Sequence, residues 1–385
     1  MSKKDSLKLH KKYKGKLEVR SKVAINNKED LSWAYSPGVA EPCKAIVKSP
    51  EDIYTYTNKG NMVLVVTDGS AVLGLGNIGP KAALPVMEGK AILLKEFANV
   101  DAFPICLDTQ DTETIIKTIE LIAPSFGGIN LEDIEAPKCI EIENRLKQSL
   151  DIPVFHDDQH GTAIVTLAAL LNSLKIAKKS IDTIKVVLCG TGAAGSSIAR
   201  LLHKSGVKTI YAYNKDGVVS KKRYQDYDFS IQALLDETIV SDSNEETLAS
   251  LLKDSDVFIG VSTNDLLNTS MVKSMNKHPI IFAMANPNPE IDPKTALKAG
   301  AFIVGTGRSD YPNQINNVLA FPGIFKGALQ AKINTITIDM MVAASKAIAD
   351  VIKAEELTPS YIIPSPFNKA VVKAVSHAIQ RFKNQ

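Results

Sequence analysis

Two pairs of acidic residues, Glu132-Asp133 and Asp157-Asp158, each follow a short β-rich run in the first half of this 385-residue chain. One helix is expected between the two runs. The resulting β-α-β unit would place both pairs at the carboxyl ends of parallel strands, where open α/β sheets bind ligands. Neighbouring carboxylates repel one another unless a cation compensates them, and oxygen ligands suit Mg²⁺ or Mn²⁺ better than zinc. The pattern therefore predicts a divalent-metal site, with solvated acids at the ends of elements as the alternative.

Two histidines, His156 and His160, flank the second acidic pair. Imidazole nitrogens are common metal ligands, so either residue could complete the predicted site. Such histidines more often satisfy local hydrogen bonds, and we expect that role here.

A glycine-rich stretch in the second half matches the G-x-G-x-x-G pattern of dinucleotide-binding turns. Its residues are Gly190, Thr191, Gly192, Ala193, Ala194 and Gly195. The stretch follows a clean β-run and opens into a helix, whose N-terminus offers free N–H groups and a positive dipole end to phosphates. It therefore predicts the diphosphate-binding turn for NAD or NADP. A second match, 74–79, lacks a strand immediately before it, and we expect a glycine-rich turn that lines the active cleft.

The residue that ends the next β-run bears on the choice of cofactor. An acidic residue there would hold the ribose 2′-OH and repel a 2′-phosphate. This chain has Asn214 instead, followed by Lys215 and Asp216. An asparagine can bond a ribose hydroxyl without excluding a phosphate, so the sequence leaves NADP open while we favour NAD.

These groups need a scaffold, and the chain alternates β-rich runs with helical stretches throughout. Strands are expected at 62–66, 102–107, 128–131, 152–155, 185–189, 209–213, 257–261, 280–285 and 301–304. The pattern predicts an α/β fold with largely parallel sheets. We expect an N-terminal α/β domain over 1–160 and a Rossmann-type, doubly wound dinucleotide-binding domain over 161–385, joined by a helix over 162–174. Further helices are expected from Thr337 onward.

Composition and charge exclude several classes of protein. Lys and Arg number 45 against 42 Asp and Glu, a net charge of +3 that gives no footprint of nucleic-acid binding. Four cysteines without paired spacing predict neither disulfides nor a zinc cluster, and reduced thiols indicate the cytoplasm. The longest apolar stretch is too short for a membrane span. The lysine-rich start, 2–16, is expected to be a solvated helix or tail rather than a secretory signal.

Seven stretches, in this order along the chain, resemble the malic enzyme family. They are WAYSPGVA (33–40), VTDG (66–69), MEGK (87–90), NLED (130–133), FHDDQHGTA (155–163), ANPNPE (285–290) and NNVLAFPG (316–323). The resemblance runs from near Lys16 to at least Phe367, and it is closest to the short bacterial form of these enzymes. It is far more specific than either glycine-rich turn.

The resemblance implies oxidative decarboxylation of L-malate to pyruvate and CO₂, with reduction of NAD⁺ or NADP⁺ and a divalent metal, Mg²⁺ or Mn²⁺. It implies Glu132, Asp133 and Asp158 as the metal ligands. It also implies a homodimer, which agrees with the general frequency of two-fold oligomers. Whether the residues of one active site come from one chain or two stays open.

The resemblance also implies the acid–base groups. Lys90 resembles the base that takes the proton of the malate C2 hydroxyl, and Tyr35 resembles the acid that protonates C3 of the enolpyruvate. Asp157 would lie beside the metal and tune Lys90. Asn286 and Asn317 resemble the amides around the cofactor and the substrate carboxylate. A free lysine has a pKa of about 10.4, and we expect burial and a nearby dication to lower it.

One departure from the family pattern concerns the substrate carboxylate. Longer eukaryotic malic enzymes carry an arginine just before the first glycine-rich turn, whereas 70–73 here contains no cation. The carboxylate would then be bound by Asn317, Lys90, the metal or a partner subunit, and Arg308 is a candidate by its charge alone.

Two other functions remain as alternatives. A malolactic enzyme would share these parts, retain its NADH and release lactate. A nucleotide sensor would share the fold without catalysis, although it would have no need of the acid–base pair.

Overall fold

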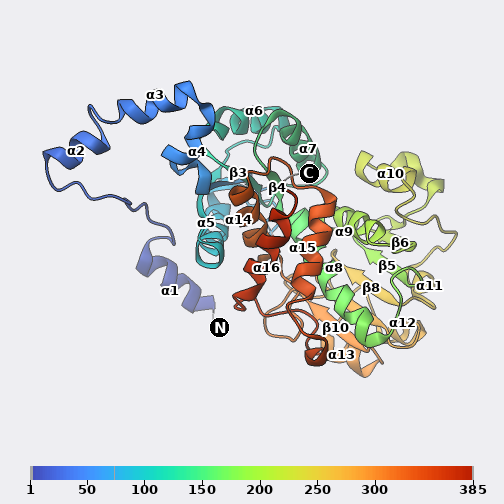
Figure 1. The fold of residues 1–385 in the computed structure, drawn as a ribbon. Helices are drawn as coiled ribbons and strands as arrows, with labels where there is room; N and C mark the ends of the chain where they lie inside the picture. The colour runs from blue at the N-terminus through green and yellow to red at the C-terminus, as the bar shows by residue number, and fades with distance from the viewer. Residues whose placement is uncertain (1–2, 73, 384–385) are drawn as a thin grey trace.

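The computed structural model describes residues 3–72 and 74–383, which form two parallel-stranded sheets flanked by helices (Figure 1). The first sheet has the order β2-β1-β3-β4, with β1 Met62–Thr67, β2 Asp101–Cys106, β3 Gly128–Leu131 and β4 Val154–His156. The second has the order β10-β9-β8-β5-β6-β7, with β5 Lys185–Cys189, β6 Thr209–Asn214, β7 Gly217–Val218, β8 Val257–Gly260, β9 Ile280–Ala283 and β10 Ile303–Thr306. The predicted α/β fold with a doubly wound second sheet is confirmed, and the short antiparallel strand β7 is an addition.

Strands β1, β3 and β4 of the first sheet are buried on both faces, which explains their nearly continuous apolar runs, while the edge strand β2 is partly exposed. One face, with Leu64 and Ile129, packs on α6 (Thr112–Ile122) and α7 (Lys138–Ser149). The opposite face, with Val63, Val65 and Phe155, packs on α5 (Gly79–Ala98) and the C-terminal helix α14 (Phe321–Ala331).

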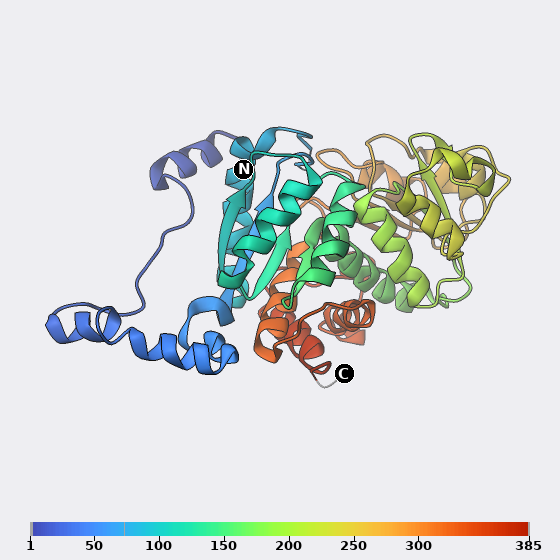
Figure 2. The same cartoon turned by 90° about the horizontal axis from the view of Figure 1, so that it is seen from above.

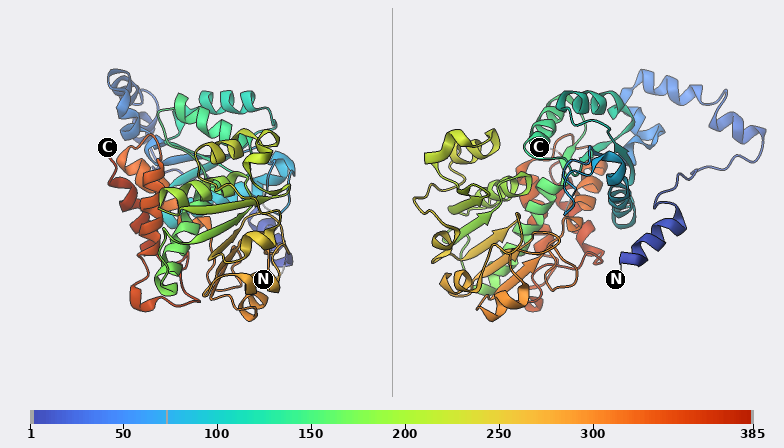
Figure 3. Two further views of the ribbon diagram at one scale, coloured as in Figure 1. Left: turned by 90° about the vertical axis from the view of Figure 1, so that its right-hand side faces the viewer. Right: turned by 180° about the vertical axis from the view of Figure 1, so that it is seen from behind.

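The second sheet is covered on both faces in the same way (Figure 3). Helices α8 (Asp157–Ala177), α9 (Ala193–Lys204) and α10 (Phe229–Asp236) belong to the core on one side. Helices α11 (Leu248–Leu252), α12 (Thr269–Ser274) and α13 (Pro293–Lys298) belong to the core on the other.

Helix α8 is longer than the predicted connecting helix and begins at Asp157, so the second acidic pair lies in its first turn. By length and composition alone it could cross a membrane, but most of it is buried in the core, where it packs on α9 and α15 (Ile338–Ala349). Helix α16 (Ala370–Gln380) packs on α14 and α15, and α14 also contacts α5. The last helices thus touch elements around both sheets.

The N-terminal residues leave the body of the molecule (Figures 1 and 2). The exposed helix α1 (Lys3–Tyr13) confirms the predicted solvated helix. Beyond it, residues 17–48 form an N-terminal arm with α2 (Lys28–Ala34) and α3 (Ala40–Lys48), and α4 (Ile53–Tyr56) returns to the first sheet. The arm exposes large apolar side chains, among them Val19, Val23, Trp33, Tyr35 and Val47.

Candidate active site

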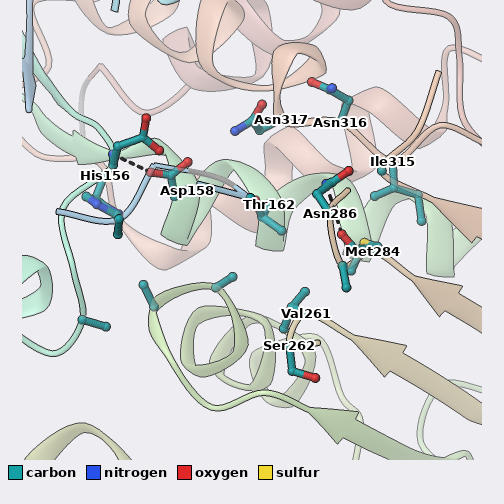
Figure 4. Close-up of a pocket in the computed structure, with 18 of the residues that line it drawn as sticks. His156, Asp158, Thr162, Val261, Ser262, Met284, Asn286, Ile315, Asn316 and Asn317 are labelled. Atoms are coloured by element: carbon teal, nitrogen blue, oxygen red, sulfur yellow. Dashed lines mark hydrogen bonds between the residues drawn. The ribbon is translucent and has the colours of Figure 1, made fainter. Parts of the chain in front are cut away.

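A cavity of about 550 Å³ lies at the carboxyl ends of the two sheets (Figure 4). Both halves of the chain contribute to its walls, as expected for a ligand site in an open α/β protein. Among the lining residues are Asp133, His156, Asp158, Ala193, Asn286 and Asn317. The structure therefore brings two of the three predicted metal ligands, part of the predicted cofactor turn and both predicted amides to one cavity.

Three carboxylates gather at the first-sheet end of the cavity. Glu132 and Asp133 follow β3, and Asp158 is in the first turn of α8. One ligand oxygen from each lies within 4.8 Å of the others. The backbone N–H of Asp133 donates to Asp158 Oδ2 at 2.8 Å, which ties the two chain segments together. This all-oxygen donor set fits a hard divalent ion such as Mg²⁺ or Mn²⁺.

Lys90, from α5, is held against this cluster. Its Nζ lies 2.8 Å from Glu132 Oε1 and 2.6 Å from Asp157 Oδ2, and only 8% of the residue is exposed. Because both partners are buried as well, the ammonium is fixed at the cluster rather than free in solvent.

The carboxylates around Lys90 oppose the effect of its burial on its pKa. Burial alone would lower the pKa of Lys90, but the carboxylates of Asp157 and Glu132 raise it by more, so it lies above that of a free lysine. Burial also raises the pKa of Asp157 and of Glu132 above their ordinary values. In the chain alone the neighbouring carboxylates therefore outweigh burial. The expectation that burial together with a nearby dication lowers the pKa of Lys90 stays a prediction.

Asp157 is pressed against the backbone of its own helix. A methyl group at Gly161 would lie 2.0 Å from Asp157 Oδ1 and 3.0 Å from Asn317 Cβ. Position 161 must therefore be glycine for Asp157 and Asn317 to approach the first turn of α8 together.

His160 satisfies local hydrogen bonds, as expected. Its Nε2 lies 2.8 Å from Glu143 Oε2 and its Nδ1 lies 2.9 Å from Ser197 Oγ, so both ring nitrogens are engaged. His156 accepts a hydrogen bond at Nδ1 from the backbone N–H of Gln159 and thereby caps α8, and burial lowers its pKa. Neither histidine is part of the three-carboxylate group.

Glu143, on α7, is not among the predicted site residues, yet it organises both histidines. It is 1% exposed, pairs with Lys147 Nζ at 3.0 Å and accepts the backbone N–H of His156 at 3.0 Å. Burial would raise the pKa of Glu143, but the charges of His160 and Lys147 outweigh it and hold that pKa well below its usual range. The available signal was its position on the helix face of the apolar residues Cys139, Ile142 and Leu146.

The predicted cofactor turn joins β5 to α9. Each of its three glycines is required, or tolerated, for a different structural reason. A methyl group at Gly195 would lie 1.9 Å from Gly190 O, and Gly190 has φ of 102° close to Val261 O. Gly192 faces open space, with no described atom within 4 Å of an added methyl group. The fold thus requires the outer two glycines, while Gly192 leaves room for a ligand.

Asn214 lies beside this turn at the end of β6. Its Nδ2 is 3.5 Å from Thr191 Oγ1, and its Oδ1 accepts the backbone N–H of Asp216 at 2.9 Å. The side chain therefore closes the β6–β7 turn next to the cofactor turn.

The earlier glycine-rich stretch, 74–79, is a turn that lines the cavity, as predicted. Gly74 lies at the wall, and a methyl group there would come within 3.4 Å of Pro287 Cδ from the second half. The backbone N–H groups of Ile78 and Gly79 donate to Gly69 O at 3.1 Å. The segment around Gly69 is held by Asp68, which accepts hydrogen bonds from Ser70 and lies 2.6 Å from Lys138 Nζ. Residue 73, part of the stretch in which the family arginine is missing, lies outside the described residues.

Arg308 does not replace that arginine in the cavity wall. Its guanidinium donates to both carboxylate oxygens of Asp310, at 2.8 and 2.7 Å, and to Pro287 O at 2.9 Å. It lines a smaller neighbouring pocket instead.

Unlike Lys90 and Asp157, which pair with each other beside Glu132, Tyr35 lies away from the carboxylate cluster. It follows α2 in the N-terminal arm, and 68% of it is exposed. Helix α2, which Tyr35 follows, lies well apart from α5, which carries Lys90 (Figure 1). One chain thus supplies the predicted base and metal ligands without the predicted acid.

Comparisons with known proteins agree along the whole chain. The family models described as "Malic enzyme, N-terminal domain" and "Malic enzyme, NAD binding domain" match residues 14–147 and 159–381. A bifunctional malic/malolactic enzyme of Bacillus subtilis is 55% identical over 98% of this chain and 92% of that protein. An NAD-dependent malic enzyme of Geobacillus stearothermophilus is 54% identical over 95% of this chain and 76% of that protein.

The fold is also similar to that of a solved malic enzyme structure. The crystal structure of an NAD-dependent malic enzyme from Thermotoga maritima superimposes with a TM-score of 0.94 at 48% identity. The match covers 98% of this chain and 99% of that one.

Proposed function

The chain belongs to the malic enzyme family, and we propose that it converts L-malate to pyruvate and CO₂ with reduction of NAD⁺, NADP⁺ being the alternative cofactor. The observation that carries the proposal is the position of Lys90. Its ammonium lies 2.8 Å from Glu132, within a carboxylate cluster that faces the cofactor turn across one cavity. Asp133 and Asp158 line the same cavity as Ala193 of the dinucleotide turn, and Lys90 reaches this carboxylate cluster through Glu132. A base, an oxygen donor set and a dinucleotide turn in such proximity are what oxidation of a 2-hydroxy acid requires.

Glu132, Asp133 and Asp158 would hold the divalent metal ion. Once bound there, Mg²⁺ or Mn²⁺ would polarise the oxygen at C2 and stabilise the enolate charge left after CO₂ departs.

The acid–base steps are assigned to this chain's own residues. Lys90 would take the C2 hydroxyl proton as the neutral amine. A dication bound to the carboxylates would favour that form, because it would offset the negative charge that raises the pKa of Lys90 in the chain alone. A bound dinucleotide would supply the hydride acceptor. Asp157, 2.6 Å from Lys90 Nζ, would orient the amine and stabilise its protonated form. Asn317 and Asn286 would donate amide hydrogen bonds to the substrate carboxylate and the cofactor. No net proton is released, since the hydroxyl proton is balanced by the one that C3 gains.

We infer that the acid that serves C3, Tyr35, comes from a second copy of the chain in a homodimer. The support is that Tyr35 lies on an arm that projects from its own body, together with exposed apolar residues such as Trp33 and Val19. Contiguous exposed apolar side chains are typical of protein interfaces, and two-fold homodimers are the commonest oligomers.

Mixing two inactive variants tests the shared site. If Lys90 and Tyr35 act across subunits, refolded mixtures of Lys90→Ala and Tyr35→Phe regain about a quarter of wild-type activity, because half the dimers then have one intact site. If both residues act within one chain, every site in the mixture keeps one defect and activity stays absent.

A second candidate activity is malolactic conversion, in which NADH stays bound and lactate is released. The observation in its favour is that the Bacillus subtilis relative carries both activities in its name.

A paired assay distinguishes the two reactions. The enzyme is incubated with L-malate and Mn²⁺, with NAD⁺ or NADP⁺, and both reduced cofactor and organic product are measured. Pyruvate with stoichiometric reduced cofactor supports the main proposal, and lactate without accumulated NADH supports the second. If neither product forms, the roles of Lys90 and Tyr35 are wrong.

We also propose the division into a substrate and metal domain at 1–160 and a cofactor domain at 161–385, located in the cytoplasm. The family matches to 14–147 and 159–381 support the division. Unpaired thiols at Cys43, Cys106, Cys139 and Cys189 support a reducing compartment.

A further inference from the structure

His156 carries a buried hydrogen-bonding atom that no step of the proposed reaction uses. The residue is 1% exposed and lines the cavity beside Asp158 (Figure 4). Its Nε2 is buried and has no hydrogen-bond partner anywhere in 3–72 or 74–383. Buried polar atoms are nearly always paired, and leaving one unpaired costs about 1–3 kcal/mol. An atom of this kind at a cavity wall indicates a ligand.

The other ring nitrogen fixes the chemistry of Nε2. The backbone N–H of Gln159 donates to Nδ1 at 3.3 Å, so Nδ1 presents its lone pair and carries no proton. The proton of the neutral ring is therefore on Nε2, which is a donor without a lone pair for a metal. This agrees with the metal-binding group, which consists of three carboxylates and neither histidine.

The ring is also held in place. The backbone N–H of His156 donates to the buried Glu143 at 3.0 Å, and the residue is in register with Leu131 of β3. A donor fixed in this way selects a ligand oxygen at one position rather than adapting to several.

The place of the ring along the cavity identifies the ligand. The lining residues Ala193 and Ala194 begin α9, whose N-terminal N–H groups suit a diphosphate. Asn286, assigned to the nicotinamide side, lies across the cavity from His156, and Asn317, assigned to the substrate, lies between them near Thr162 (Figure 4). We propose that His156 Nε2–H donates a hydrogen bond to a diphosphate oxygen of the bound dinucleotide, so that a residue of the first sheet helps to bind the cofactor.

The test separates the donor from the helix cap. His156→Ser keeps a side-chain oxygen that can accept the Gln159 N–H, because serine is a favoured N-cap, but it cannot reach the cavity. Dissociation constants for NAD⁺ and ADP-ribose are measured by calorimetry on the Mn²⁺-loaded enzyme without malate. We expect both to rise by about 3- to 10-fold, as for one lost hydrogen bond. The melting temperature of the ligand-free enzyme and Mn²⁺ binding, followed by electron paramagnetic resonance, should not change.

The matched control is His203→Ser, at an exposed position near the other end of α9, which should change none of these values. Unchanged binding of both ligands to His156→Ser would overturn the proposal. A loss confined to NAD⁺ would place the contact on the nicotinamide half and overturn the diphosphate assignment, and a change in Mn²⁺ affinity would assign His156 to the metal. A ¹⁵N spectrum that places the ring proton on Nδ1 would also contradict it.

Discussion

The carboxyl ends of the two sheets meet at one cavity but are built in opposite ways. The first-sheet end consists of charged side chains that hold one another, with Lys90 between Glu132 and Asp157 and with Glu143 behind them. The second-sheet end consists of backbone and small residues, where Gly190 and Gly195 let a turn close within van der Waals distance. The structure of the first region depends on the balance of buried charges, and that of the second depends on the small size of its residues. Substitutions in the two regions should therefore lower activity or stability for different physical reasons.

The largest effect on activity is expected at Lys90, which is both part of the buried charge cluster and the proposed base. Lys90→Met removes the proposed base, and kcat should fall by about 10²- to 10⁴-fold. The NAD⁺ dissociation constant, measured by calorimetry, should stay within a factor of about two, because the cofactor turn is on the other sheet. Lys81→Met, an exposed change on the same helix, is the control and should leave kcat intact. Activity above a tenth of wild type would show that Lys90 is not the base.

The buried charge network around Glu143, outside the proposed metal site, should affect stability instead. Glu143→Gln leaves Lys147 and the two histidines without their carboxylate, and breaking a buried ion pair of this kind costs about 3–5 kcal/mol. Denaturant unfolding at pH 7 measures the loss. Glu141→Gln, at an exposed site on α7, should cost less than about 0.5 kcal/mol. Equal effects of the two changes would contradict the role given to Glu143.

The same network gives stability a pH dependence with a defined sign. The pKa of Glu143 is lower in the folded chain than in the unfolded chain, where it is about 4.3. Its contribution is therefore full above that unfolded value and decreases as pH falls through it, because the unfolded state then binds the proton more readily. The stability gap between wild type and Glu143→Gln should be constant from pH 7 to 5.5 and narrow towards pH 3.5. A gap that widens on acidification would contradict the assigned pKa direction.

At the second-sheet end, two glycines of one turn should respond differently. Gly195→Ala forces a methyl group against Gly190 O and should lower both unfolding stability, by about 1–3 kcal/mol, and NAD⁺ affinity. Gly192→Ala meets no described atom, so melting temperature should hold while NAD⁺ affinity falls. Thermal unfolding and calorimetry on both variants measure the difference. Loss of melting temperature in Gly192→Ala would show that the turn has no free space there.

The smallest effect concerns cofactor choice. Asn214→Asp places a carboxylate beside the turn and should weaken NADP⁺ binding by about tenfold relative to NAD⁺, because it repels the 2′-phosphate. The ratio of kcat/KM for the two cofactors measures this. An unchanged ratio would mean that the 2′ position lies elsewhere.

The sequence predicted what depends on local pattern. Each expected strand is present because β-rich runs buried on both faces are continuous and distinct, and the turn at Gly190 follows from a strand that opens into a helix. The three carboxylates came together because chain order fixes where parallel strands end.

What the sequence did not predict depends on contacts between distant elements. In the sequence, Glu143 and Lys138 cannot be told apart from charged residues on the surface. Their roles depend on the packing of α7, which brings Glu143 to the backbone of β4 and Lys138 to Asp68. The raised pKa of Lys90 depends on carboxylates from two other segments, and the distance of Tyr35 from them depends on the path of the arm.

The position of helix α8 has a consequence for how the molecule unfolds. It starts with Asp157 and Asp158 at the carboxylate cluster and continues through the core that also holds the second sheet and the C-terminal helices. The two halves therefore share one cooperative unit, and neither can unfold locally without exposing this helix. Its backbone amides should be among the slowest in the chain to exchange with deuterated solvent, at a rate set by global unfolding.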